Sequence, residues 1–235
     1  MGRLEPGTVE QVVAGLAQAC LDNDCALLGG ETAEMPDFYA PGEYDLAGFI
    51  VGIVEEDGRP GKARVQEGDV LIGIGASGFH TNGYSLLRRL IFERLELDVD
   101  DAFPGMDDSV ASVLLRPHRG YARALRPLLD EGVIHALAHI TGGGIPGNLD
   151  RVMPDGLQAR VERASWPVPP EFVAVQEHGR VDEEEMFHTL NMGIGMIAVV
   201  APDDAAAVLQ RLGDAGEQTW RIGGVARGDQ AVVLS

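Results

Sequence analysis

The sequence predicts an α/β or α+β protein in which a mixed sheet is covered by helices, mainly on one face. Three observations support this fold class. Short apolar runs at 70–74 and 197–200 have the length and composition of buried strands. Segments at 83–95 and 202–215 carry apolar residues at helical spacing. Strand-like and helix-like segments alternate along the chain, which is typical of layered α/β folds.

Composition limits the possible partners. The chain has 235 residues, enough for one large or two modest domains, and 45% of them are hydrophobic. Its 18 basic and 37 acidic residues give a net charge of −19, which argues against binding nucleic acid or an anionic membrane. Lys62 is the only lysine, so a phosphorylated ligand would have to be met by backbone N–H groups, arginines and a divalent cation.

The sequence also limits the compartment and the role of its cysteines. No run approaches the roughly 18 apolar residues of a membrane span, and the first residues lack the pattern of a signal peptide. We therefore expect a cytoplasmic protein. Cys20 and Cys25 form neither a zinc pattern nor a disulfide framework, and we interpret both as packed thiols.

The N-terminal part predicts a helix at 8–21 followed by apolar strands at 25–28 and 46–54. Between the strands, Gly29 and Gly30 form a turn that presents Glu31 and Glu34 together. Such a carboxylate pair can bind magnesium or orient a polar substrate. The alternative is a glycine turn with two solvated glutamates.

A polar segment with glycines and a proline at 55–68 predicts a domain boundary. The part before it is too small to bury both faces of a sheet. We therefore expect that the chain lacks an N-terminal portion or borrows packing from another chain.

The central motif is a strand, loop and helix at 70–95. Its glycine-rich loop at 75–83 lets the backbone approach a ligand, and Thr81, Asn82 or Ser85 is predicted to cap the following helix. His80, within the loop, is the side chain able to exchange a proton near neutral pH. The loop therefore predicts an anion site, with a plain strand-to-helix turn as the alternative.

A second glycine loop repeats this design. A predicted strand at 133–140 runs directly into Thr141 and three glycines at 142–144. His135 and His139 are four residues apart, but the strand pattern and the lack of a third ligand following them argue against a metal site. We expect His139 to contact substrate or to orient the loop.

The remaining elements are predicted from the same signals. An arginine-bearing helix, opened by residues 116–121 and ending near 130, has a solvated face. Further on we expect a strand at 156–161, short helices at 171–178 and 183–190, and a closing hairpin of 220–225 with 231–234.

With these stretches located, the chain resembles the phosphoribosylformylglycinamidine cyclo-ligase family, also called aminoimidazole ribonucleotide synthetase. Four strings carry the resemblance in the family's order: GGETAEMPDFY at 29–39, SGFHTNGYSL at 77–86, HALAHITGGGIPGNLDRVMP at 135–154 and EEMFHTLNMGIGM at 184–196. The resemblance implies that residues 1–57 are the last part of an ATP-binding and dimerisation domain. Residues 58–235 would then be a complete substrate- and phosphate-binding domain.

The resemblance also implies an activity: ATP-dependent cyclisation of formylglycinamidine ribonucleotide to aminoimidazole ribonucleotide, with release of ADP and phosphate. The implied cofactors and partners are ATP, Mg²⁺, the small-molecule substrate and a second subunit of a homodimer. The implied catalytic residues are His80 and His139. Substrate or phosphate contacts fall on Ser77, Gly78, Thr81, Asn82, Arg119, Thr141, Gly142, Gly143, Gly144 and Asn191, and metal or nucleotide contacts on Glu31, Thr32 and Glu34.

Two positions depart from the family pattern. His118 stands where a hydroxyl residue is expected, and Asp150 where proline is expected. The family's earlier glycine-rich segment, with its aspartate and lysine, and its later aspartate-bearing segment have no counterpart here, which puts the activity of this chain alone in question.

Other functions remain as alternatives. One is a different ATP-dependent member of the same superfamily, such as selenophosphate synthetase, thiamine monophosphate kinase or a hydrogenase maturation enzyme. Another is a non-catalytic substrate-binding fragment. A hydrolase using Ser77 and His80 is disfavoured, because Ser77 lacks the G-x-S-x-G elbow and no third residue is placed to orient the histidine.

Overall fold

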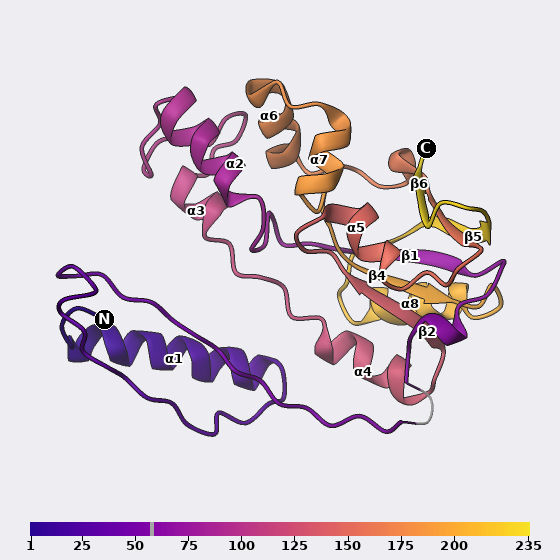
Figure 1. The fold of residues 1–235 in the computed structure, drawn as a ribbon, viewed down its shortest axis with the longest axis horizontal. Coiled ribbons are helices and arrows are strands. Elements are labelled where there is room, and N and C mark those ends of the chain that lie inside the picture. Colours follow the sequence, from indigo (N-terminus) through magenta and orange to yellow (C-terminus); the bar gives the residue numbers. More distant parts are fainter. Residues whose placement is uncertain (57–58) are drawn as a thin grey trace. The chain divides into compact units, whose positions relative to one another are not determined.

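A computed structural model describes residues 1–56 and 59–235, and the chain divides into two compact units, Met1–Asp57 and Gly58–Ser235 (Figure 1). Residues 57 and 58, where we place the domain boundary, lie outside the described residues. Within the described parts, no helix combines the length and apolar character needed to cross a bilayer.

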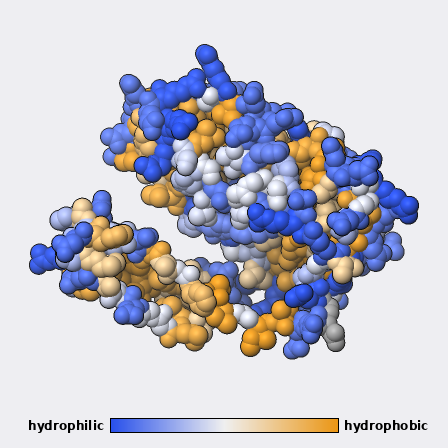
Figure 2. Space-filling model, in the orientation of Figure 1, coloured by the Kyte–Doolittle hydropathy of each residue, from blue (hydrophilic) through white to orange (hydrophobic). Residues whose placement is uncertain are grey.

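Residues 1–56, the described part of the N-terminal unit, contain one helix, α1 (Pro6–Asp22), which begins with a proline in its first turn. The strands predicted at 25–28 and 46–54 do not form: both segments lack strand structure, and Leu28, Phe49 and Ile53 are more than nine-tenths exposed. A strand requires a neighbour for its backbone hydrogen bonds, and the described part of this unit offers none to either segment. Figure 2 shows the resulting hydrophobic surface in orange along this unit.

The C-terminal unit is built on one six-stranded mixed sheet, which confirms the predicted fold class. Its strands are β1 (Val70–Gly75), β2 (Ile134–His139), β3 (Leu157–Val161), β4 (Ile194–Val200), β5 (Thr219–Arg227) and β6 (Val232–Leu234). They are arranged in the order β2-β4-β1-β5-β3-β6. The β3–β6 pair is parallel and the other paired strands are antiparallel.

Helices cover both faces of this sheet, so the expectation of cover mainly on one face is wrong. They are α2 (Tyr84–Arg88), continued by the π-helix η2 (Arg89–Arg94), α3 (Val110–Leu114), α4 (Ala122–Asp130), α5 (Gly144–Asp150), α6 (Pro170–Gly179), α7 (Glu183–Thr189) and α8 (Ala205–Asp214), with short 3₁₀ turns η1 (Lys62–Arg64) and η3 (Arg163–Ser165). Successive β1 side chains alternate between faces. Leu71 belongs to the core beneath α2, α3, α5, α6 and α7, whereas Ile72 belongs to the core shared with α4 and α8 (Figure 1).

The predicted closing hairpin is also wrong. β5 and β6 do not pair with each other, because β3 lies between them. Both edges of β5 are already occupied, one by β1 and the other by β3. The last strand therefore adds to the free edge of β3, where Ala159 is opposite Val232.

Candidate functional site

The two glycine loops lie at the same end of the sheet. β1 and β2 both pair antiparallel with β4, one on each side of it, so they run in the same direction. Their C-terminal ends are opposite the start of β4: Gly75 pairs with Ile194 and His139 with Met196. The loops approach closely enough that a methyl group at Gly142 would contact Asn82 Oδ1 at 3.3 Å. The two glycine loops therefore converge at this end of the sheet.

His80 is held in an unusual backbone conformation inside the first loop. Its φ angle is 60°, in the left-handed region that a non-glycine residue rarely adopts. The side chain is buried, and its Nε2 accepts a hydrogen bond from the Ser77 N–H at 3.1 Å. Burial, followed by the nearby charges of His118, His139 and Arg119, lowers the pKa of His80 to about 3. The imidazole is therefore neutral near pH 7, with its remaining proton on Nδ1.

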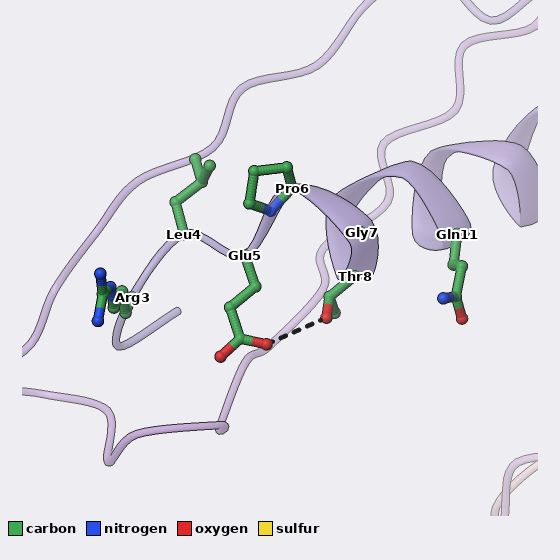
Figure 3. A pocket seen from close by; sticks show the side chains of 7 residues that line it. All are labelled: Arg3, Leu4, Glu5, Pro6, Gly7, Thr8 and Gln11. Carbon is green, nitrogen blue, oxygen red and sulfur yellow. Dashed lines mark hydrogen bonds between the residues drawn. The ribbon is translucent and has the colours of Figure 1, made fainter.

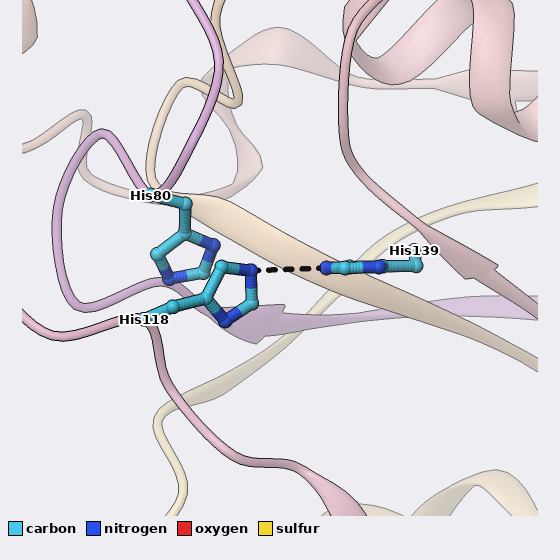
Figure 4. A group of neighbouring side chains, drawn as sticks. All are labelled: His80, His118 and His139. Atoms are coloured by element: carbon cyan, nitrogen blue, oxygen red, sulfur yellow. Dashed lines mark hydrogen bonds between the residues drawn. The ribbon is translucent and has the colours of Figure 1, made fainter. Parts of the chain in front are cut away.

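His80, His118 and His139 form a cluster contributed by three different segments (Figure 4). The rings of His80 and His118 stack with centroids 3.8 Å apart, and His118 Nε2 lies 3.2 Å from His139 Nε2. Burial and the neighbouring His118 lower the pKa of His139. His118 was not predicted as a site residue. Its departure from the family pattern was the one signal that marked it.

Asn191, which follows α7, holds the first loop in place through hydrogen bonds. Its Nδ2 donates to the Gly78 carbonyl oxygen at 2.9 Å, and its Oδ1 accepts from the Gly193 N–H at 2.8 Å. Asn191 is buried. In this structure its amide group is therefore committed to positioning the loop backbone.

Asn148 holds the second loop in a similar way, although it was not among the predicted site residues. Its Nδ2 donates to the carbonyl oxygens of Thr141, Gly142 and Gly144, and its Oδ1 accepts from Thr141 Oγ1. The C=O and N–H groups of a trans peptide point in opposite directions. Drawing the carbonyls of Thr141 and Gly142 toward Asn148 therefore turns the N–H groups of Gly142 and Gly143 outward, on exposed residues.

Two glycines of this loop have backbone conformations that favour glycine. Gly143 has a φ of 96° and Gly144 one of 59°. A side chain at Gly144 would also collide with the Phe187 carbonyl of α7. The glycine run thus serves close packing at Gly144, and it leaves Gly142 and Gly143 open to a ligand.

The remaining predicted residues of this unit surround the cluster. Ser77 Oγ donates to the Pro117 carbonyl at 2.7 Å, which ties the first loop to the segment carrying His118. Thr81 is exposed in the turn beside His80. Neither Thr81, Asn82 nor Ser85 caps α2, because its N-cap is Gly83, which has no side-chain cap bond. Arg119 forms an ion pair with Glu217, with 2.7 Å between Nε and Oε2.

A partly buried ion pair beside the first loop was missed by sequence reasoning. The Arg116 Nη1 atom lies 3.0 Å from Oε1 of Glu171, whose side chain is 5% exposed. A methyl group at Gly78 would contact Arg116 Cδ at 3.4 Å. Arg116 was predicted to lie on a solvated face, and this is wrong, since its guanidinium is paired with Glu171 and Asp108 and its side chain is only 29% exposed.

Glu31, Thr32 and Glu34 are exposed in the N-terminal unit. Glu34 Oε1 accepts a hydrogen bond from the Leu4 N–H at 2.6 Å. Among the described residues, the side chains that gather in a group of three or more potential metal ligands are those of the histidine cluster, and Glu31 and Glu34 are not in it. Two carboxylates and a hydroxyl nevertheless fit the usual protein share of a Mg²⁺–nucleotide site, in which phosphates and water supply most ligands.

Two surface hollows lie outside the cluster. One, of about 440 Å³, is formed by residues around the start of α1, including Arg3, Glu5 and Thr8 (Figure 3). The other, of about 350 Å³, lies between the start of α2 and α7 and is bordered by Arg89 and Glu185. Neither contains a histidine of the cluster, so we place the candidate site at the converging loops on chemical grounds.

Curated relatives match nearly the whole chain. A phosphoribosylformylglycinamidine cyclo-ligase from Trichlorobacter lovleyi is 48% identical over 224 residues, which cover 95% of this chain and 64% of that protein. The protein of the same name from Geobacillus thermodenitrificans is 46% identical, covering 97% of this chain and 66% of the relative. The chain thus spans slightly less than two thirds of the length of these relatives.

Solved structures share the fold at lower identity. Thiamine-monophosphate kinase from Stenotrophomonas maltophilia K279a superposes with a TM-score of 0.68 at 18% identity, covering 100% of this chain and 69% of that one. The hydrogenase maturation protein HypE gives a TM-score of 0.64 at 22% identity, covering 98% of this chain and 68% of that one. At such identities the likeness concerns the fold alone.

Family matches cover both units. Residues 66–234 match the family "AIR synthase related protein, C-terminal domain", and residues 1–54 match "AIR synthase related protein, N-terminal domain". The chain belongs to the AIR synthase related family.

Proposed function

We propose that the protein carries out the ATP-dependent cyclisation of formylglycinamidine ribonucleotide to aminoimidazole ribonucleotide, releasing ADP and phosphate. The observation that carries this proposal is the convergence of the two glycine loops on His80 and His139 in a chain up to 48% identical to named cyclo-ligases. The fold likeness to a thiamine-monophosphate kinase does not favour that activity, because the identity is 18%.

The second loop suits a phosphorylated ligand. Asn148 turns the N–H groups of Gly142 and Gly143 outward, where they can meet phosphate oxygens without a lysine. Asn82 lies across from Gly142, and Thr81 is exposed beside it. We infer that these residues, with Ser77, Gly78 and Thr141, surround the substrate and the phosphoryl group being moved.

The reaction needs an activated oxygen, because the amide oxygen of the substrate is a poor leaving group. Transfer of a phosphoryl group from ATP to the formyl oxygen makes that oxygen a phosphate leaving group. An amidine nitrogen of the same molecule then attacks the carbon, and phosphate departs. Since the attack is intramolecular, holding the substrate in one conformation accounts for much of the acceleration. When bound, Mg²⁺ neutralises charge on the transferring phosphoryl group.

His80 acts in this proposal as a neutral hydrogen-bond donor. Its Nε2 is occupied by the Ser77 N–H, so Nδ1–H is the group left to face the developing charge on substrate oxygen. His139, at the end of β2, is the second candidate for contact with the reacting atoms. Arg119 contacts the ribose phosphate if Glu217 shares its guanidinium with the ligand.

The N-terminal unit has a different role in this proposal. Residues 1–57 belong to an ATP-binding and dimerisation domain, where Glu31, Thr32 and Glu34 contact Mg²⁺ or nucleotide. Residues 58–235 form the substrate-binding domain. The working enzyme is a cytoplasmic homodimer with small-molecule substrates, and it binds neither nucleic acid nor membrane.

Calorimetry and a phosphate-release assay test the proposal. The chain should bind formylglycinamidine ribonucleotide, and any phosphate release should require both the ribonucleotide and ATP. In an active preparation, His80→Asn should lower the rate at least about 100-fold, whereas His188→Thr, at an exposed histidine of α7, should leave it unchanged. Binding without turnover would identify a non-catalytic substrate-binding fragment. Failure to bind the ribonucleotide would contradict the proposal.

A further inference from the structure

The cluster of His80, His118 and His139 has the composition of a transition-metal site. One nitrogen from each ring lies within 4.8 Å of the others, and the grouping includes no carboxylate. Imidazole nitrogen suits zinc, nickel, cobalt and copper ions, whereas magnesium and calcium prefer oxygen ligands. The cluster is therefore distinct in chemistry from a magnesium–nucleotide site.

Hydrogen bonding prepares His118 to act as a ligand. Its Nδ1 lies 2.9 Å from the Arg119 carbonyl oxygen, which can only accept a hydrogen bond. The neutral ring therefore carries its proton on Nδ1 and has a lone pair on Nε2. A ligating histidine is usually oriented in this way, through its other ring nitrogen.

The spacing of His118 and His139 also fits a shared ion. Their Nε2 atoms are 3.2 Å apart. Two nitrogens bound to one tetrahedral zinc-class ion at about 2.0–2.1 Å would lie about 3.3–3.4 Å apart. Both residues are exposed, so an ion and a completing water molecule can enter from solvent.

His80 supplies the third nitrogen. Its Nδ1 is buried and has no hydrogen-bond partner among the described residues, and its ring stacks on that of His118, beside His139 (Figure 4). A buried polar atom without a partner needs an explanation, and a bound ion is one that fits a ring nitrogen. Its lone pair becomes available if the proton passes to Nε2, and the Ser77 N–H then loses its acceptor.

We propose that His80, His118 and His139 bind one divalent transition-metal ion of the zinc class, with water completing its coordination. Substrate and metal require opposite tautomers of His80, so a bound ion should exclude the substrate. That consequence rests on the proposed function, whereas metal binding itself does not.

Cobalt titration of the untagged chain, freed of metal by a chelator, tests the site. The visible absorption of four-coordinate Co²⁺ should reach saturation at one ion per chain, and Zn²⁺ but not Mg²⁺ should remove it. His118→Thr should weaken Co²⁺ binding at least about 10-fold. Even the loss of a residue that only orients a ligand costs about that much, and His118 is proposed to bind the ion directly. His188→Thr, at an exposed histidine outside the cluster, should have no effect.

Circular dichroism checks that each variant is folded, and His118 is exposed, so its replacement should be tolerated. In amide NMR spectra of the wild type, Zn²⁺ should shift the Ser77 N–H resonance and speed its exchange with solvent. The proposal is overturned if Co²⁺ does not bind, if His118→Thr binds as tightly as wild type, or if Mg²⁺ displaces the ion.

Discussion

Asn191 Nδ2 lies 2.9 Å from the carbonyl oxygen of Gly78, and this bond connects the segment after α7 to the loop that carries His80. The two residues are 113 positions apart in the chain. Both ends of the Asn191 amide are used, since Oδ1 accepts from the Gly193 N–H. The shape of the first loop thus depends on a side chain from a segment that is distant in the sequence.

Replacing Asn191 with alanine should destabilise the protein by about 2–4 kcal/mol, because a buried carbonyl and a buried N–H both lose their partner. Urea denaturation measures this change. Asn191→Asp is the matched control: it keeps the acceptor for Gly193 but cannot donate to Gly78. A stability loss below about 0.5 kcal/mol for the alanine variant would show that water replaces both bonds.

A second prediction concerns Gly144, where α5 packs against the backbone of α7. Gly144→Ala should cost at least about 2 kcal/mol, since its methyl group collides with the Phe187 carbonyl and its φ is positive. Gly147→Ala in the same helix meets nothing within 4 Å and should stabilise by up to about 1 kcal/mol. Thermal denaturation compares the two, and equal midpoints would contradict this account of the packing.

Local sequence patterns predicted the parts of the site that are formed by neighbouring residues in the chain. β1, β2 and their glycine loops follow from short apolar runs ending in glycines, and His80 and His139 lie at the predicted places. The two loops come together because β1 and β2 lie on either side of β4, and no local sequence pattern encodes this strand order. The family resemblance assigned both loops to one substrate site because it rests on long strings that include both of them.

Residues placed by tertiary packing were missed. His118 lies in a segment without regular structure, which reaches the cluster because Pro117 accepts a bond from Ser77. Asn148 and Glu171 carry no motif of their own, since their roles arise from partners brought near by folding. The apolar segments at 25–28 and 46–54 had strand composition, but strand formation depends on a neighbour.

The pH dependence of stability should reveal the neutral state of His80. Its pKa is about 3 in the folded protein and 6.5 in the unfolded chain, so the unfolded state binds more protons between these values. The contribution of His80 to stability is therefore fully present above pH 6.5 and is lost as the pH is lowered toward 3. His139, whose pKa is also lowered, acts in the same direction.

Urea denaturation in EDTA across this range measures the effect. His80→Gln should make the unfolding free energy less dependent on pH, because glutamine does not titrate. The slope should fall by an amount that corresponds to at most about one proton bound on unfolding. His188→Gln, at an exposed position, is the control for loss of a histidine. An unchanged slope in His80→Gln would mean that the ring is protonated in the folded protein as readily as in the unfolded one.

The last prediction separates ligand binding from stability in the second loop. At Gly142 the backbone does not require glycine, and an added methyl group meets only Asn82 Oδ1, at 3.3 Å. Gly142→Ala should therefore change the unfolding free energy by less than about 1 kcal/mol. Because the methyl group stands between the two loops, it should weaken binding of formylglycinamidine ribonucleotide at least about 10-fold, a loss of about 1.4 kcal/mol. Calorimetry on Gly142→Ala and on Gly147→Ala, which lies away from the opposing loop, makes the comparison. If both variants bind the ribonucleotide as tightly as wild type, the space between Asn82 and Gly142 does not hold the ligand, and the second loop serves only as a turn.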